Sequence, residues 1–136
     1  MGRPMTDHDV QLVKSFIDRF SSGDIEAASQ HLDDRAIIDE AGDLPYSGRY
    51  VGPLGLQQLV RKIPRSLRAQ IQSVEVASAG SFVVSKLGLR FVSRSTGHEV
   101  AVEAVEIYMI EAGLITHVDV YYKSAGAIRA LVDESS

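Results

Sequence analysis

Glu106 is the residue of this sequence best placed for acid–base chemistry. It falls in a predicted strand over residues 98–111, where successive side chains point to opposite faces. On that alternation Glu106 shares the inward face with Tyr108 and lies among apolar neighbours. A carboxyl group is seldom buried without a partner, because losing its water is costly. Glu106 is therefore predicted either to hold and move a proton or to pair with a cation such as Arg49 or Lys86.

Other reactive groups are sparse. The chain has no cysteine, which excludes disulfides, thiol catalysis and thiolate metal sites. The four histidines, His8, His31, His98 and His117, are scattered and lack metal-ligand spacing, and His117 is expected at an outward strand position. No serine lies in a nucleophile elbow, and no glycine-rich segment has the arrangement of a phosphate-binding loop. Neither a metal nor a cofactor is expected.

Composition limits the possible partners. The 136 residues, 45% hydrophobic and 24% charged, suit a single domain over residues 1–136 with an ordered core of about 6–132. A net charge of −4 without a large Lys/Arg cluster disfavours nucleic acid. No apolar run approaches the roughly 18 residues of a membrane span, and the start lacks a signal-peptide core. A cytoplasmic protein with no membrane partner is expected.

The first half of the chain is typical of helices. Apolar residues from Val10 to Phe20 recur at intervals of three and four, after possible N-caps at Thr6 and Asp7 and before a possible C-cap at Gly23. Similar patterns predict a short helix over 25–32 and a third over 54–63, which Pro64 should end.

The second half is typical of strands. Strands are predicted over 35–40, 69–78, 81–93, 98–111 and 114–123, with a loop over 41–53. Tight turns at Gly80, Gly97 and Gly113 make neighbouring strands antiparallel. Helices followed by a meander indicate an α+β fold with the helices on one face of the sheet.

The outer face of that sheet is also apolar. In the strand over 98–111, Val105, Ile107 and Met109 point away from the helices. A second copy of the chain is the simplest cover for such a surface, so a homodimer through the outer sheet face is expected.

Three segments together resemble a known family. They are Phe-Ser-Ser-Gly-Asp-Ile-Glu-Ala at 20–27, Leu-Pro-Tyr-Ser-Gly-Arg-Tyr-Val-Gly-Pro at 44–53, and the hairpin at 105–116. In this order they look like the SnoaL-like, ketosteroid isomerase-like branch of the nuclear transport factor 2-like superfamily. The resemblance implies a cone-shaped, cystatin-like fold, in which a curved antiparallel sheet wraps three N-terminal helices around a deep hydrophobic pocket. Members include isomerases, polyketide cyclases, epoxide hydrolases, dehydratases and non-catalytic carriers, so the fold alone leaves function open.

The resemblance assigns roles to particular positions. The general base of the isomerases falls on Glu40, and the protonated carboxyl of their oxyanion hole falls on Glu106. The tyrosine of that oxyanion hole falls on Phe16, which has no hydroxyl. The inward carboxylate of the epoxide hydrolases falls on Val120. The adjacent Asp119 should point away from the pocket unless a bulge shifts the strand by one residue.

The pocket is expected to be built from aromatic and aliphatic side chains, of which the tyrosines could replace the missing hydroxyl. Its predicted lining is Phe16, Tyr46, Tyr50, Leu87, Leu89, Phe91, Tyr108, Val118, Val120 and Tyr122.

A glutamate pair in an apolar cavity could support proton transfer. Burial raises each pKa and a neighbouring charge raises one of them further, as ketosteroid isomerase exemplifies. We expect Glu40 to move a proton at carbon while Glu106 polarises a carbonyl. The predicted function is a cofactor-independent isomerase, aldol-type cyclase or dehydratase acting on a hydrophobic carbonyl compound.

Other interpretations stay open at this point. Glu40 could be a solvated residue at a strand end. The protein could be a non-catalytic ligand-binding or accessory protein, or have an epoxide hydrolase-like activity if Asp119 faces the pocket.

Overall fold

The computed structural model describes residues 3–135. Its first element is helix α1 (Asp7–Ser21). The Thr6 hydroxyl accepts a hydrogen bond of 3.3 Å from the main-chain N–H of Asp9. The Asp9 carboxylate accepts the Thr6 N–H in return at 2.8 Å, which completes a capping box. Arg3 pairs with Asp9 at 2.8 Å and ties the preceding segment to the helix. The predicted N-cap at Thr6 is confirmed.

The elements that follow differ from expectation mainly at their ends. They are α2 (Ile25–Ser29), β1 (Leu32–Glu40), β2 (Gly48–Val51) and α3 (Gly52–Lys62). The predicted loop over 41–53 is correct for residues 41–47 and wrong for the rest, because Gly48–Val51 pairs antiparallel with the last residues of β1 and α3 begins at Gly52. Helix α3 ends before Pro64, as predicted.

Four long strands and a last helix complete the chain. They are β3 (Leu67–Ala79), β4 (Phe82–Ser93), β5 (Glu99–Glu111), β6 (Leu114–Tyr122) and α4 (Ala125–Glu134). The predicted strands agree with these to within two residues. Gly80, Gly97 and Gly113 adopt φ angles of 69°, 78° and 77°, which supply the left-handed turns between strands. Helix α4 was not predicted. Its Ser135 cap donates to Ser93 of β4 at 2.7 Å, which fixes the helix end to the sheet.

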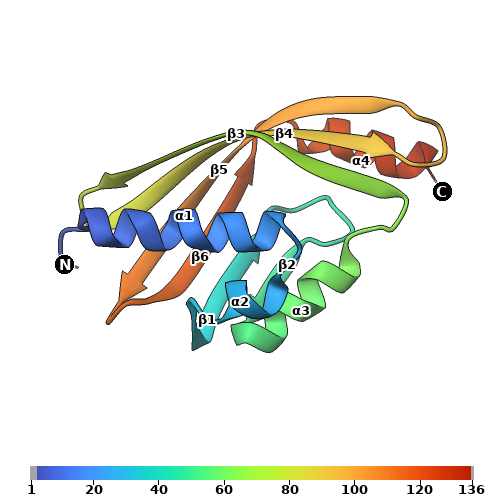
Figure 1. Cartoon of the computed structure of the whole chain (residues 1–136). Coiled ribbons are helices and arrows are strands. Elements are labelled where there is room, and N and C mark those ends of the chain that lie inside the picture. The colour runs from blue at the N-terminus through green and yellow to red at the C-terminus, as the bar shows by residue number, and fades with distance from the viewer. Residues whose placement is uncertain (1–2, 136) are drawn as a thin grey trace.

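The six strands form one sheet in the order β2-β1-β6-β5-β4-β3 (Figure 1). The prediction of an α+β fold is confirmed, with one correction to the sheet. Strands β1 and β6 pair in parallel, so the sheet is mixed and not wholly antiparallel. This pairing joins residues about eighty positions apart, and short turns give no information about it.

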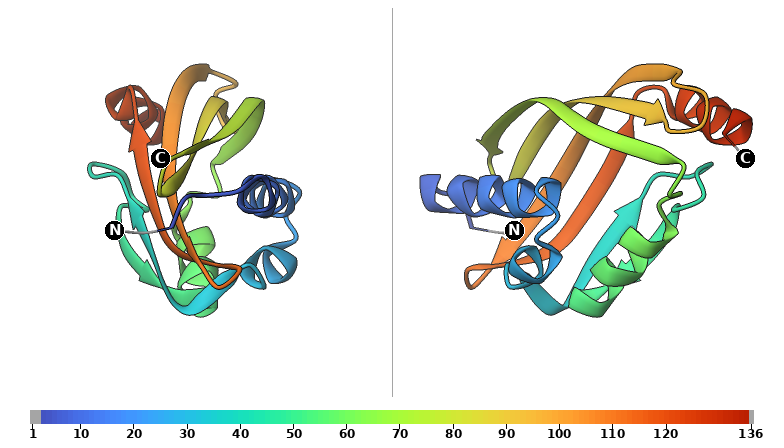
Figure 2. Two further views of the ribbon diagram at one scale, coloured as in Figure 1. Left: turned by 90° about the vertical axis from the view of Figure 1, so that its left-hand side faces the viewer. Right: turned by 45° about the vertical axis from the view of Figure 1, so that its right-hand side comes forward.

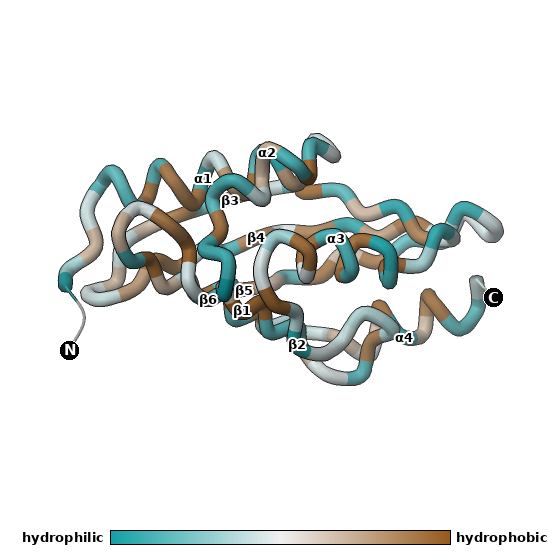
Figure 3. Tube along the Cα trace, turned by 90° about the horizontal axis from the view of Figure 1, so that it is seen from below, coloured by the Kyte–Doolittle hydropathy of each residue, from teal (hydrophilic) through white to brown (hydrophobic). Residues whose placement is uncertain are grey.

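Helices α1, α2 and α3 lie in the hollow of the curved, unclosed sheet (Figure 2). Along α1 and α3 hydrophobic and hydrophilic residues alternate in the helical period, which gives each helix one apolar face (Figure 3). Those faces bury Val13, Ile17, Leu56 and Leu59 against the sheet. No helix among residues 3–135 is long and apolar enough to span a membrane.

Candidate active site on the concave face of the sheet

Glu106 points into the fold from the middle of β5, as the strand alternation predicts. Its neighbours on the same face, Ala104 and Tyr108, are 2% and 0% exposed. The Tyr108 hydroxyl donates to Glu106 Oε1 at 2.5 Å, and the Ser85 hydroxyl donates to the same oxygen at 3.0 Å. Burial raises the pKa of Glu106, while these two hydrogen bonds lower it because they stabilise the ionised form.

Glu40 reaches the same face from the end of β1. In the parallel register Ile38 lies opposite Val118 and Asp39 lies opposite Asp119. One residue further along both strands, Glu40 lies beside Val120. Val120 is in turn the direct partner of Glu106 on β5. The two glutamates therefore lie in one row across the sheet, with one strand between them and about 10 Å between their main chains.

The pKa of Glu40 is raised as well. Burial, followed by the negative charge of Glu106, raises the pKa of Glu40 to about 8. One hydrogen bond opposes this rise, from the Tyr122 hydroxyl to Glu40 Oε1 at 3.4 Å. The Tyr46 hydroxyl donates to the Tyr122 hydroxyl at 3.4 Å, which extends this series of hydrogen bonds to the loop before β2. Glu40 is thus enclosed enough to be mainly protonated at neutral pH and is not a solvated strand end.

Neither carboxyl has a cation partner among residues 3–135. Arg49 pairs with Asp39 at 3.5 Å and Lys86 with Glu103 at 3.7 Å, both on the outer face. The predicted alternative of a structural ion pair for Glu106 is therefore wrong. Strand alternation explains why the glutamates have no such partner, since Arg49 and Lys86 point to the outer face while the glutamates point to the inner one.

The remaining predicted lining residues are distributed around this row. Phe16 packs edge-on against Tyr108 with ring centroids 6.1 Å apart. Tyr50 instead stabilises the loop before β2, since its hydroxyl donates to the main-chain carbonyl of Tyr46 at 2.9 Å. The aliphatic and phenyl positions on β4 and β6 all point inward and are buried or partly buried: Leu87, Leu89, Phe91, Val118 and Val120.

Asp119 lies on the outer face of the sheet. Val118 and Val120 on either side are 2% and 6% exposed and point inward, so parity turns Asp119 outward. The register irregularity on the β5–β6 pair falls between Met109 and Ile110 and does not invert Asp119. The inward carboxylate that an epoxide hydrolase-like activity requires is absent from this position.

The matches to known proteins agree with this architecture. The sequence model of the SnoaL-like domain matches residues 13–118. This chain belongs to the SnoaL-like domain family. The chain also resembles solved structures at low identity, and no curated protein matches the chain.

Three such structures agree over nearly the whole fold. An NTF2-like protein of Burkholderia xenovorans LB400 is 20% identical with a TM-score of 0.80, covering 93% of this chain and 98% of that chain. TerC, co-crystallised with polyporic acid, is 15% identical with a TM-score of 0.81 and the same coverage. A proposed polyketide cyclase of Xanthomonas campestris pv. campestris is 20% identical with a TM-score of 0.78, covering 92% and 97%. At these identities the likeness establishes the fold.

Sequence reasoning missed one contributor to the site of the SnoaL-like domain. Ser85 is 0% exposed and lies directly opposite Glu106 on β4. A signal was present, because Ser85 is a polar residue at an inward position between Val83 and Leu87. Recognising its role needed the β4–β5 register, which brings it beside the carboxyl.

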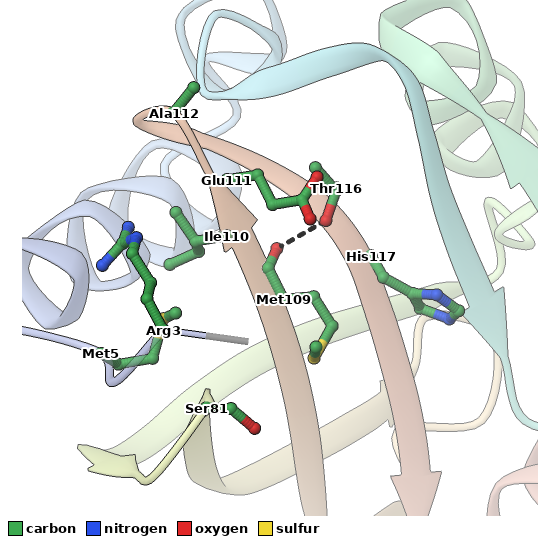
Figure 4. A pocket seen from close by; sticks show the side chains of 9 residues that line it. All are labelled: Arg3, Met5, Ser81, Met109, Ile110, Glu111, Ala112, Thr116 and His117. Atoms are coloured by element: carbon green, nitrogen blue, oxygen red, sulfur yellow. Dashed lines mark hydrogen bonds between the residues drawn. The ribbon is translucent and has the colours of Figure 1, made fainter. Parts of the chain in front are cut away.

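Two hollows among residues 3–135 lie away from the glutamate pair. One of about 310 Å³ lies along β4 and β5 near Lys123. The other, of about 560 Å³, lies where Arg3 and Met5 pass the β5–β6 hairpin, and His117 forms part of its wall (Figure 4). The apolar pocket around Glu40 and Glu106 remains a prediction.

Proposed function

We propose that this SnoaL-like domain is a cofactor-independent acid–base enzyme acting on a hydrophobic, carbonyl-bearing small molecule. The observation that carries the proposal is the row of Glu106, Val120 and Glu40 on the concave face, without a cation partner among the described residues. Two such carboxyls do not both ionise near neutral pH, because burial and mutual repulsion oppose the second charge. The pair therefore holds a proton that it is able to transfer.

The hydrogen bonds favour placing the negative charge of the pair on Glu106. Its Oε1 accepts two hydroxyl donors at 2.5 and 3.0 Å, whereas Glu40 accepts one at 3.4 Å. Glu106 Oε2 accepts none of the hydrogen bonds found within residues 3–135 and is left to take a proton. Glu106 is therefore assigned as the base and Glu40 as the acid, which reverses the order that the family resemblance implies.

The chemistry follows from this assignment. Glu106 removes a proton from the carbon next to the substrate carbonyl, while Glu40 gives its proton to the carbonyl oxygen. The electrons of the broken C–H bond form the C=C bond of an enol, and those of the C=O π bond take up the proton from Glu40.

If the substrate is a β,γ-unsaturated ketone, the enol is a conjugated dienol. Glu106 then returns its proton to the γ-carbon while Glu40 takes back the enol O–H proton, which re-forms the C=O bond and isomerises the substrate. In an aldol step the enol carbon attacks a second carbonyl and closes a ring, Glu40 takes back the enol proton, and Glu106 protonates the new alkoxide. In a dehydration the Glu106 proton leaves with the β-hydroxyl group as water, while Glu40 takes back the enol proton.

A hydrophobic substrate is favoured by the surroundings of the pair. The inward side chains beside it are aromatic or aliphatic, including Phe16, Leu87, Val118 and Tyr122. The fold is shared with a proposed polyketide cyclase and with TerC, which was crystallised with polyporic acid. These likenesses support a small organic ligand without naming it.

Deuterium exchange tests the proposal without knowledge of the natural product. The protein is incubated in D2O with a panel of cyclic ketones, and loss of the α-proton signal is followed by NMR. Glu106→Gln should slow exchange by about 10³-fold or more, because the base is gone. Glu40→Gln should slow it by only about 10- to 100-fold, since the glutamine N–H still donates to the carbonyl. Glu103→Gln, exposed on the outer face of the same strand, is the matched control and should leave the rate unchanged.

A non-catalytic binding protein is the second candidate, favoured by the phenyl group of Phe16 where the family resemblance implies a hydroxyl. It predicts that a bound ketone or quinone keeps its affinity in the Glu40→Gln, Glu106→Gln double variant. No exchange by the native protein at any pH between 5 and 9, together with retained binding, would decide for this candidate.

We also propose that a second copy of the chain covers the outer sheet face. Val105, Met109 and Tyr121 are 37%, 38% and 53% exposed there, which is unusual for large apolar side chains on adjacent strands. Sedimentation velocity at several concentrations should give a dimer. A Val105→Lys variant, which places a charge in the middle of the patch, should shift the protein to monomer.

A further inference from the structure

Three side chains with metal-binding atoms meet on the outer face of the sheet, away from the glutamate pair. His117 and Asp119 are two residues apart on β6 and so share a face. Asp39 on β1 is the direct parallel partner of Asp119. One imidazole nitrogen and one carboxylate oxygen from each aspartate all lie within 4.8 Å of one another.

The negative charges of Asp39 and Asp119 are only weakly compensated by nearby positive charge. Two carboxylates directly opposite each other on neighbouring strands repel. The nearby cation, Arg49, approaches Asp39 only at 3.5 Å from a largely exposed side chain. The Nε2 atom of His117 is shut off from solvent and has no hydrogen-bond partner, although Asp119 Oδ1 lies 3.6 Å away. A buried polar atom without a partner is uncommon and is often satisfied by a bound ion or water.

We propose that Asp39, His117 and Asp119 bind a divalent transition-metal ion of the Zn²⁺ type. Bonds of about 2.1 Å in a tetrahedral site place ligand atoms about 3.4 Å apart. The His117–Asp119 separation of 3.6 Å already fits this value, and a small rotation of the half-exposed Asp39 side chain completes the set. A neutral imidazole together with two carboxylates favours Zn²⁺, Mn²⁺ or Fe²⁺ over Mg²⁺ or Ca²⁺, which prefer oxygen ligands.

His117 borders the hollow of about 560 Å³, whereas Asp39 and Asp119 do not line it. The His117 ring extends from β6 towards β1 (Figure 4). Three protein ligands leave at least one coordination position open to water or another small ligand. The ion would cross-link β1 to β6, the parallel pair that sets Glu40 beside Val120. The metal site stands independently of the proposed acid–base activity.

Isothermal titration of the whole chain with ZnCl₂ tests the proposal. We expect one equivalent of Zn²⁺ to bind and MgCl₂ at the same concentration to give no heat. His117→Gln and Asp119→Asn should each weaken Zn²⁺ binding by more than about 100-fold, because each removes a ligand. The matched control is His98→Gln, which breaks an exposed histidine–carboxylate pair with Glu134 at 2.7 Å and should leave Zn²⁺ affinity unchanged.

Arg49 provides a variant that should act in the opposite direction. Arg49→Gln removes a positive charge beside Asp39 without touching a ligand, so Zn²⁺ binding should tighten by about five-fold. Absence of one-equivalent binding by the native chain would overturn the proposal. Binding that survives His117→Gln unchanged, or that is lost in His98→Gln, would overturn it equally.

Discussion

Replacing Glu40 with glutamine should stabilise the folded protein relative to the native protein, and the difference should grow as the pH rises. Burial and the charge of Glu106 raise the pKa of Glu40 from its ordinary 4.5 to about 8 in the folded state. The folded protein therefore holds this proton more tightly than the unfolded chain does. Its contribution to stability is fully present below pH 4.5 and is lost progressively as the pH rises to about 8. Glutamine does not ionise, so the variant escapes this loss.

The magnitude follows from the size of the pKa rise. Each pH unit between the two values reduces the free energy of unfolding by about 1.4 kcal/mol in the native protein relative to the variant. The difference should reach about 3 kcal/mol at pH 7 and between about 4 and 5 kcal/mol at pH 9. Such a gain is large compared with the total stability of about 5–15 kcal/mol for a domain.

Urea unfolding followed by circular dichroism at pH 5, 6, 7, 8 and 9 measures the difference directly. Glu103→Gln is the control, because Glu103 is exposed and pairs with Lys86 at 3.7 Å, and its effect should stay within about 1 kcal/mol at every pH. If the native protein and Glu40→Gln lose stability in parallel across this range, Glu40 is solvated and the proton-holding pair does not exist.

Three further substitutions and one control test hydrogen bonding and packing in the fold. Tyr108→Phe should cost about 1–3 kcal/mol in urea unfolding and raise the pKa of Glu106 further, measured by carboxyl ¹³C NMR, because a 2.5 Å hydrogen bond is lost. Leu56→Ala should cost about 2–5 kcal/mol, since Leu56 is 1% exposed, while Leu54→Ala in the same helix, 63% exposed, should stay within about 0.5 kcal/mol. Gly52→Ala should lower the melting temperature by several degrees, because φ is +67° and the added Cβ would strike the main chain of β1.

Local features of the fold were predictable because they depend on neighbouring residues. The N-cap at Thr6 and the glycine turns are set by residues within one turn of the chain. The alternation along β5 placed Glu106 and Tyr108 correctly because a strand has a fixed period of two. The SnoaL-like family was predicted from the resemblance of three segments in order, and the family match over residues 13–118 confirms it.

Features that depend on distant partners were not predictable. Strand β2 is four residues long and has a glycine at its start, so it exists only through its pairing with β1. Helix α4 begins just after β6 without a side-chain cap and depends on packing by Ile128 and Leu131. The role of Ser85 likewise required the register between β4 and β5.

The parallel β1–β6 pairing explains why adjacent residues on β1 belong to two different proposed sites. Asp39 points outward to Asp119 and His117, while Glu40 points inward to the row that ends at Glu106. A shift of one residue in this pairing would exchange the two faces and abolish both arrangements together. A Zn²⁺ ion on the outer face would hold that register fixed without contacting the glutamates. Metal binding at Asp39 should therefore slow exchange of the β1 amide protons. It should also lower the pKa of Glu40 slightly, because the negative charge of Asp39 is one of the lesser causes that raise this pKa, after burial and the charge of Glu106.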